Sequence, residues 1–352
     1  MRPLAFTIIL TAARLLAADQ SALSLVPSDA AGVLGIEWRG ILDSPAGVAL
    51  KAQLNKPELA KLPPFPGVQD ILLNQLDSIL IATPATSFTG GTQPPALVIV
   101  KGRFQPAALR AMIMGMGKAA PVEKYRTVEL LSPPEESGPG AKMSNNRVAL
   151  LDANTILAGD RVQVRAAIDR IQGGRLVQSH RGILEGVAEL AAANHVWMAF
   201  TLPSDARKDV SKGMNQAFAD VKSAQLGVSF GSGLAVRMNV LTKDPSSAAL
   251  VAQTVQGFIG MAALSGGNQN PQLTDMLGKV KIAPEGSQVK IALTLDQSEF
   301  DKMIRDSQSI RMAGQPAATS PVSRPEPTGP KTIRITGLDS GPVEVPYSGA
   351  KK

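Results

Sequence analysis

Hydrophobic and polar residues repeat along this chain with two different periods, which indicate strands in some segments and helices in others. Every second residue is apolar over 224–230 and over 234–240, as in half-buried strands. Over 105–116 apolar residues recur every three or four positions, as on one face of a helix. We therefore predict an α+β protein of mainly antiparallel sheet, with helices packed on one face.

The same periodicities predict strands and helices over most of the chain. Strands are expected near 32–38, 78–83, 96–101, 127–131, 147–151, 155–158, 196–200, 224–230, 234–240, 279–283 and 289–295. Helices are expected near 44–54, 68–76, 105–116, 160–171, 183–193, 204–221, 245–262 and 296–304. Asp160 with Gln163, and Asp296 with Glu299, form capping boxes that support two of the helix starts.

The order of elements is similar in the two halves of the chain. Residues 96–116 correspond to 234–257, each a strand followed by a helix that Pro106 or Pro245 opens. Residues 147–171 correspond in the same way to 288–307. We predict two related units, 19–178 and 179–312, that arose by duplication; the alternative is a chance similarity of two α+β patterns.

From 313 onwards the composition changes. Five prolines lie among Ser, Thr, Ala and Gly between 316 and 330, which is typical of a linker without a core. Short strand-like segments follow at 331–336 and 341–346. Residues 313–352 are therefore expected to form a linker and tail that pairs along a sheet edge or stays mobile.

The first 18 residues have the pattern of a signal peptide. Arg2 precedes an almost wholly apolar run that ends in small residues at Ala18, before the polar Asp19. The run is shorter than the roughly 20 residues needed to span a bilayer. We predict cleavage near Ala18, export to the periplasm or the medium, and no transmembrane segment in the mature chain. The alternative is a buried N-terminal helix.

Composition excludes several chemistries. The 352 residues contain no cysteine, which excludes disulfides, thiolate catalysis, cysteine zinc sites and a lipid-anchored lipoprotein. The net charge of +7 includes +2 from the leader and +2 from the tail, so the long body carries only +3. Because the body also lacks basic runs interleaved with aromatic residues, we expect no nucleic-acid binding.

One motif matches a catalytic pattern. Gly227-Val-Ser229-Phe-Gly231 fits the G-x-S-x-G elbow of α/β-hydrolases, which requires a sharp turn from a strand to a helix. Here Ser229 lies inside an alternating strand that continues into another strand, and both histidines precede it. The sequence therefore favours a hairpin over a nucleophile elbow.

The other candidate groups are more simply explained as structural. His180 and His195 stand 15 residues apart with no carboxylate at ligand spacing, and Glu135-Glu136 lies in a Pro/Gly-rich loop. Gly115-Met-Gly117-Lys118 resembles a truncated dinucleotide motif, but it ends a helix instead of opening one. We accordingly predict no catalytic, cofactor-binding or metal-binding residues, and no cofactor.

Two apolar segments are candidates for a binding surface. Phe258–Leu264 is the most apolar helical stretch, and Met112, Met114 and Met116 form a second soft surface. Such segments usually lie in a core, but either one would suit a lipid or protein partner if it were exposed.

Three segments resemble a pattern found in exported bacterial proteins of unknown function. Leu25–Ala30 carries a "P-x-D" before a strand, Ala96–Phe104 ends in "G-x-F" before a helix, and Val148–Ala167 holds a "GD" helix start after a hairpin. The resemblance covers about half the chain. It implies an envelope protein and assigns no catalytic residues.

These observations favour an exported non-enzymatic protein that binds a partner or associates with the envelope. Its expected protein contact is the tail or a sheet edge. The alternatives are an extracytoplasmic hydrolase with a site assembled in space, for which Ser229 is the named candidate, and a lipid carrier with a cleft under the Phe258–Leu264 helix.

Overall fold

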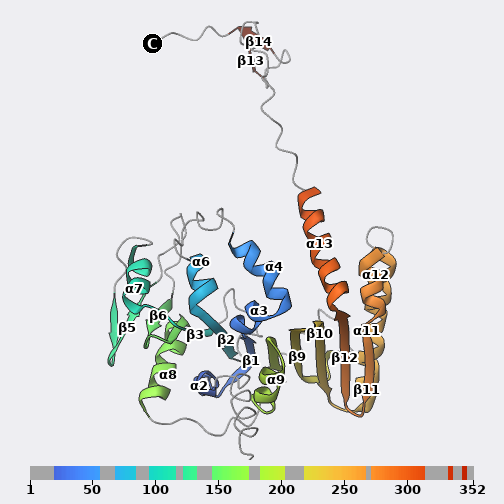
Figure 1. Cartoon of the computed structure of the whole chain (residues 1–352), viewed down its shortest axis with the longest axis horizontal. Coiled ribbons are helices and arrows are strands. Elements are labelled where there is room, and N and C mark those ends of the chain that lie inside the picture. The colour runs from blue at the N-terminus through green and yellow to red at the C-terminus, as the bar shows by residue number, and fades with distance from the viewer. Residues whose placement is uncertain are drawn as a thin grey trace, which may run out of the picture. The chain divides into compact units, whose positions relative to one another are not determined.

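The fold is a large antiparallel sheet with helices against it, seen in a computed structural model of the chain (Figure 1). The structure describes residues 20–55, 68–84, 95–115, 122–132, 145–173, 183–202, 218–266, 271–313, 332–335 and 343–346. Packing divides the chain into two compact units, Met1–Met303 and Ile304–Lys352. The predicted leader, 1–18, lies outside the described residues.

Twelve strands form the sheet in the first unit, in the order β11-β12-β10-β9-β8-β1-β2-β3-β7-β6-β5-β4, and all neighbours are antiparallel. Their bounds are β1 Ala30–Ile36, β2 Leu76–Pro84, β3 Leu97–Gly102, β4 Glu123–Tyr125, β5 Val128–Leu131, β6 Asn146–Leu150, β7 Thr155–Asp160, β8 Val196–Thr201, β9 Val221–Gly231, β10 Gly233–Thr242, β11 Lys281–Glu285 and β12 Gln288–Asp296.

Along the chain, most of the helices lie between strands of the sheet. Their bounds are α2 Gln20–Leu23, α3 Trp38–Asp43, α4 Pro45–Leu54, α6 Val68–Asp70, the π-helix η1 Ile71–Gln75, α7 Pro106–Gly115, α8 Arg161–Gln172, α9 Val187–Ala193, α11 Pro245–Gly266, α12 Pro271–Gly278 and α13 Gln297–Ala313. Ser44 caps α4 by accepting the Gly47 amide proton, and Asp160 caps α8 by accepting that of Val162.

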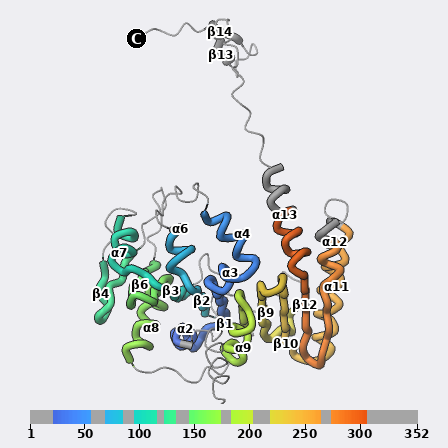
Figure 2. Tube along the Cα trace, viewed as in Figure 1, coloured from blue at the N-terminus to red at the C-terminus, as the bar shows by residue number. Residues whose placement is uncertain are grey.

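The strand order is the same on both sides of the central β1–β8 pair. Outwards from β1 it reads β1-β2-β3-β7-β6, and outwards from β8 it reads β8-β9-β10-β12-β11. On each side a helix follows the third strand and another follows the fourth, namely α7 and α8, or α11 and α13; on the second side α12 comes directly after α11. Figure 2 traces the blue-to-green chain on one side of this centre and the yellow-to-orange chain on the other. In the part of the chain that the structure describes, the first side carries two extra strands, β4 and β5, beyond β6.

Two buried cores lie on opposite faces of this sheet. Ala199 on β8 belongs to the core that α2, α8 and α9 cover, whereas its neighbour Phe200 packs against the core that α11 covers. Consecutive residues of a strand point to opposite faces, so the covered face changes between the two halves of the sheet. On β9 and β10 the face away from α11 carries the polar residues Gln225, Arg237 and Asn239, of which Arg237 is exposed and the other two are half-buried.

The α+β class and the antiparallel sheet are confirmed, and the predicted strands are present in the described residues. The predicted helix over 204–221 lies mostly outside those residues, but its last residue, Val221, begins β9 instead. In the tail, the two predicted segments are strands, β13 Thr332–Ile335 and β14 Val343–Pro346, and they pair with each other. The described part of α7 reaches Gly115, and residues 116–121, which include most of the predicted helix stop at Gly115-Met-Gly117, lie outside the described residues.

Candidate functional site

The larger of two described cavities opens at one end of the first half of the sheet. Its volume is about 830 Å³, within the range of pockets that bind small molecules. It is bordered by α2, the start of α7, β5, the turn between β6 and β7, and the end of α8. Aliphatic residues make up much of its lining: Leu25, Val128, Leu131, Leu150, Leu151 and Ile171.

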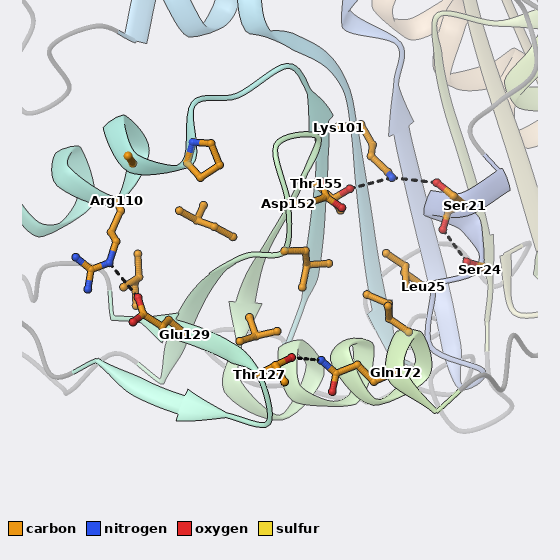
Figure 3. A pocket seen from close by; sticks show the side chains of 17 residues that line it. Ser21, Ser24, Leu25, Lys101, Arg110, Thr127, Glu129, Asp152, Thr155 and Gln172 are labelled. Atoms are coloured by element: carbon orange, nitrogen blue, oxygen red, sulfur yellow. Dashed lines mark hydrogen bonds and ion pairs between the residues drawn. The ribbon is translucent and has the colours of Figure 1, made fainter.

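Polar side chains border this cavity on several sides (Figure 3). The Lys101 ammonium donates to the Ser21 hydroxyl at 2.9 Å and to the Thr155 hydroxyl at 3.1 Å. We call these three residues the Lys101 cluster. Across the cavity the Arg110 Nε donates to the Glu129 carboxylate at 2.9 Å. The cavity thus combines an aliphatic lining with a cationic group at one end and an ion pair at the other.

A second cavity, of about 480 Å³, lies between α12 and the start of α13. Lys279 and Glu299, which form an ion pair, line it together with Met276, Lys302 and Met303. Neither described cavity includes a residue of α11, so the carrier cleft expected under Phe258–Leu264 is not one of them.

Helix α11 lies along β10, β11 and β12 and buries one face against them (Figure 1). Its start is fixed by Asp244, whose carboxylate accepts hydrogen bonds from the Ser246 hydroxyl at 2.6 Å and the Ser247 amide at 2.8 Å. These bonds lower the pKa of Asp244 to about 2. Asp244 therefore stays ionised and caps the helix over the whole physiological range.

The other face of α11 exposes large apolar side chains to solvent. Leu264 is 83% exposed, Met261 56%, Leu250 48% and Phe258 47%. Their successive spacings of 8, 3 and 3 residues place them along one stripe of the helix, which we call the α11 stripe. The sequence favoured a core position for Phe258–Leu264, but the structure leaves much of this segment exposed.

In the described part of the chain, Pro245–Leu264 is the one helix that is long and apolar enough to cross a membrane. Only 22% of its most apolar 18-residue stretch is buried. The 22 residues of α11 contain no ionisable side chain. Because one face packs on the sheet through Val251 and Ala252, the exposed stripe has the arrangement of a surface contact.

A cluster of arginines surrounds one carboxylate at the β4 edge. Arg161 and Arg165 donate to Glu123, with an Arg161 Nε distance of 2.8 Å, and Arg147 lies 3.9 Å away. Burial raises the pKa of Glu123, but the hydrogen bonds and charges of Arg165 and Arg161 outweigh it and bring the pKa below its ordinary value. The Arg165 guanidinium also stacks 4.7 Å from the Tyr125 ring centre, so this cluster joins β4 to α8.

The residues that matched catalytic patterns do not form a site. Ser229 lies within β9, opposite Ala235 in the hairpin to β10, so the strand-to-helix turn that an elbow requires is not present. The Nδ1 atom of His195 accepts the Phe230 amide proton at 3.0 Å, and burial lowers the pKa of His195. His180 and Glu135-Glu136 lie outside the described residues.

The part of the chain that the structure describes contains no group of three or more His, Asp or Glu side chains that could hold a metal ion. The functional features that the sequence did not reveal are the cavity and the Lys101 cluster. Their residues come from segments between Ser21 and Gln172, and no local motif connects them.

Both ends of the sheet carry features that oppose edge pairing. On β11, Lys281 and Glu285 are exposed, and the strand also contains Pro284, which cannot donate a backbone hydrogen bond. At the other end β4 has only three residues. The edge contact predicted for a protein partner therefore has little support from these strands, whereas contact through the tail stays a prediction.

The fold and the site together describe an α+β protein with an open antiparallel sheet and an amphiphilic cavity. No protein-family model matches the sequence, and no curated protein matches it. Among solved structures, crystal form IV of the protein TP0453 matches with a TM-score of 0.43 and 12% identity, over 80% of this chain and 95% of that one. A likeness at this level adds nothing to the assignment of a function.

Proposed function

We propose that this chain is an exported, non-enzymatic envelope protein that attaches to a lipid membrane surface through the α11 stripe. The observation that carries the proposal is the exposure of Leu250, Phe258, Met261 and Leu264 along one uncharged helix. A monomeric soluble protein gains nothing from holding such side chains in water.

A lipid surface fits the stripe better than a protein groove does. The stripe extends over 14 residues, or roughly 21 Å of helix. Protein interfaces usually surround an apolar centre with a polar, charged rim, but α11 has no charged residue anywhere along its length. After cleavage of the leader, which carries +2 of the total +7, a net charge of +5 remains and adds a general attraction to anionic head groups.

The helix is expected to lie in the membrane surface rather than to cross the bilayer. Val251 and Ala252 on its inner face are buried against β10–β12, and crossing would remove them from this core. An interfacial helix buries only its outer face, to a depth of roughly 5–10 Å.

Vesicle flotation tests this function directly. The mature protein is expected to float with phosphatidylglycerol/phosphatidylethanolamine vesicles, and the triple variant F258S/M261Q/L264Q to stay in the soluble fraction. The substituted side chains are exposed, so the variant keeps its fold. The matched control is V48Q/V162Q, which removes two other exposed valines, on α4 and α8, and is expected to float like the native protein.

Two results would contradict the proposal. One is equal flotation of the native protein and the triple variant. The other is a native protein that ignores vesicles but forms dimers that the triple variant does not form, which would assign the stripe to a second copy of the chain.

The tail can be examined separately. Because the stripe lies in the first unit, a protein that ends at Met312 is expected to bind vesicles as the intact chain does. A pull-down from envelope extract with both proteins then tests whether the tail contacts a protein partner.

A further inference from the structure

Two charged side chains without an ion-pair partner border the smaller cavity, between α12 and the first turns of α13 (Figure 1). Asp275 lies on α12 and Lys302 on α13, and both are exposed. Within the part of the chain that the structure describes, neither side chain forms an ion pair or a hydrogen bond. One negative and one positive charge therefore border the same space, and no neighbouring group compensates either of them.

The other charged side chains that line the cavity compensate each other. Lys279 donates to the Glu299 carboxylate, whose second oxygen accepts the Asp296 amide proton at 3.1 Å. Asp296 in turn accepts the Glu299 amide proton at 2.9 Å, so this ion pair belongs to the cap of α13. Asp275 and Lys302 are thus the charges that remain for a ligand.

A buried hydroxyl group also lines the cavity. The Oγ1 atom of Thr274 is buried and has no hydrogen-bond partner in the described structure. A buried polar group without a partner costs free energy, and a ligand with a polar group beside Thr274 would supply the missing hydrogen bond. This hydroxyl indicates an occupant independently of the two charges.

The remaining side chains of the lining are apolar. Leu295 is only 2% exposed, and Met276 and Met303 are half-buried. Methionine side chains adapt to the shape of an apolar group that packs against them. The volume of about 480 Å³ lies in the lower part of the roughly 300–1,000 Å³ range of small-molecule sites, which suits a ligand of dipeptide size.

We infer that this cavity binds a dipeptide with free termini and apolar side chains, its ammonium group beside Asp275 and its carboxylate beside Lys302. The two termini match both charges, whereas a ligand with a single charge would leave one of them unpaired. The apolar side chains of the ligand would pack against the leucine and methionines of the lining and leave water. No residue of the α11 stripe lines this cavity, so binding does not depend on the proposed membrane attachment.

Isothermal titration calorimetry of the native protein with the dipeptide Leu-Leu measures this binding. Leu-Leu is expected to bind one to one. N-acetyl-Leu-Leu lacks the ammonium group and Leu-Leu amide lacks the carboxylate. Each is expected to bind about tenfold more weakly, because each loses one hydrogen bond between charged groups.

Each charge variant is expected to lose the discrimination that its own side chain provides. Asp275→Asn is expected to bind Leu-Leu about tenfold more weakly and to bind N-acetyl-Leu-Leu as tightly as Leu-Leu. Lys302→Met is expected to show the same loss and to bind the amide as tightly as Leu-Leu. Both side chains are exposed, so the variants keep their fold. The matched controls Glu285→Gln and Lys281→Met remove exposed charges from β11 and are expected to bind like the native protein.

Thr274→Val separates binding from stability. It replaces an unpartnered hydroxyl by a methyl group of similar size, so the variant is expected to be at least as stable as the native protein and yet to bind Leu-Leu about threefold more weakly. F258S/M261Q/L264Q is expected to bind Leu-Leu like the native protein, so loss of vesicle binding and loss of peptide binding are distinguishable. The inference is overturned if the native protein shows no saturable binding of Leu-Leu, if acetylation and amidation leave the affinity unchanged, or if folded Asp275→Asn or Lys302→Met binds like the native protein.

Discussion

The indole ring of Trp197 on β8 lies directly over the backbone of Gly35 on β1, its antiparallel partner at the centre of the sheet. A Cβ atom on Gly35 would stand 2.1 Å from Cε2 of this ring. Trp197 is only 2% exposed and packs with Val33 and Leu80 in the first core. The absence of a side chain at Gly35 thus lets the largest core residue sit where the two halves of the sheet meet.

Gly35→Ala is expected to lower the free energy of unfolding by about 3 kcal/mol, because the new methyl group forces Trp197 out of its packed position. Urea denaturation followed by circular dichroism measures this. Gly231→Ala is the control, since nothing lies within 4 Å of a Cβ there. Equal stability of the two variants would show that the ring moves aside without cost.

Glu123→Gln is expected to destabilise the protein by about 1–3 kcal/mol at pH 7, because Arg161 and Arg165 lose the carboxylate that accepts their hydrogen bonds. The pKa of Glu123 is below its ordinary value in the folded protein, so its contribution is complete above pH 4.5 and is lost as the pH falls through the folded-state pKa.

Urea midpoints at pH 7 and pH 3 check the Glu123 prediction. The difference between the native protein and Glu123→Gln is expected to shrink at pH 3. Glu285→Gln, at an exposed pair with Lys290, serves as the control and is expected to change little. If Glu123→Gln lowers the urea midpoint equally at both pH values, the stabilisation does not come from the carboxylate charge of Glu123.

His195 is expected to titrate below its ordinary pKa of 6.5. Burial lowers its pKa, and Nδ1 must remain unprotonated to accept the Phe230 amide proton. The unfolded state therefore binds a proton more readily, so this contribution to stability is complete above pH 6.5 and is lost as the pH falls below it. An NMR titration of the two histidines, assigned with the variant H180Q, gives the value directly; a pKa above 6.5 for His195 would refute the prediction.

The sequence predicted the strands well because each carries its own alternation. Leu234, Val236, Met238 and Val240 mark one face of β10 whatever their neighbours are. Alternation does not say which helix covers that face, so the sequence did not predict that the two cores lie on opposite sides. At Val221 an apolar residue fitted both a helix end and a strand start, and the pairing with Thr242 decides for the strand.

The candidate sites depend on tertiary structure more than the strands do. Phe258 and Leu264 have the pattern of a buried helix, and only the position of α11 on the outside of the sheet shows that they face solvent. Ser21, Lys101 and Thr155 are far apart in sequence and meet because β3 and β7 are neighbours and α2 lies beside their ends. No local pattern could have joined them.

We propose that the two halves arose by internal duplication. The shared strand order outwards from β1 and from β8, with helices at the same two places, supports this. The boundary predicted near 178 lies between α8 and α9, within one compact unit that the β1–β8 pair joins. Duplicated units that share a sheet in this way depend on each other for stability.

Export is the last prediction, and it can be tested on the precursor. The apolar run up to Ala13 and the small residues before Asp19 predict cleavage after Ala18. Ala18→Arg places a large charged side chain where signal peptidase requires a small one, so the variant is expected to accumulate uncleaved. The control Ser21→Arg changes a residue beyond the predicted cleavage site and is expected to be processed normally. N-terminal sequencing of the protein from an envelope fraction would give a start near Asp19, whereas an intact Met1 in the cytoplasm would refute export and favour an N-terminal helix that belongs to the fold.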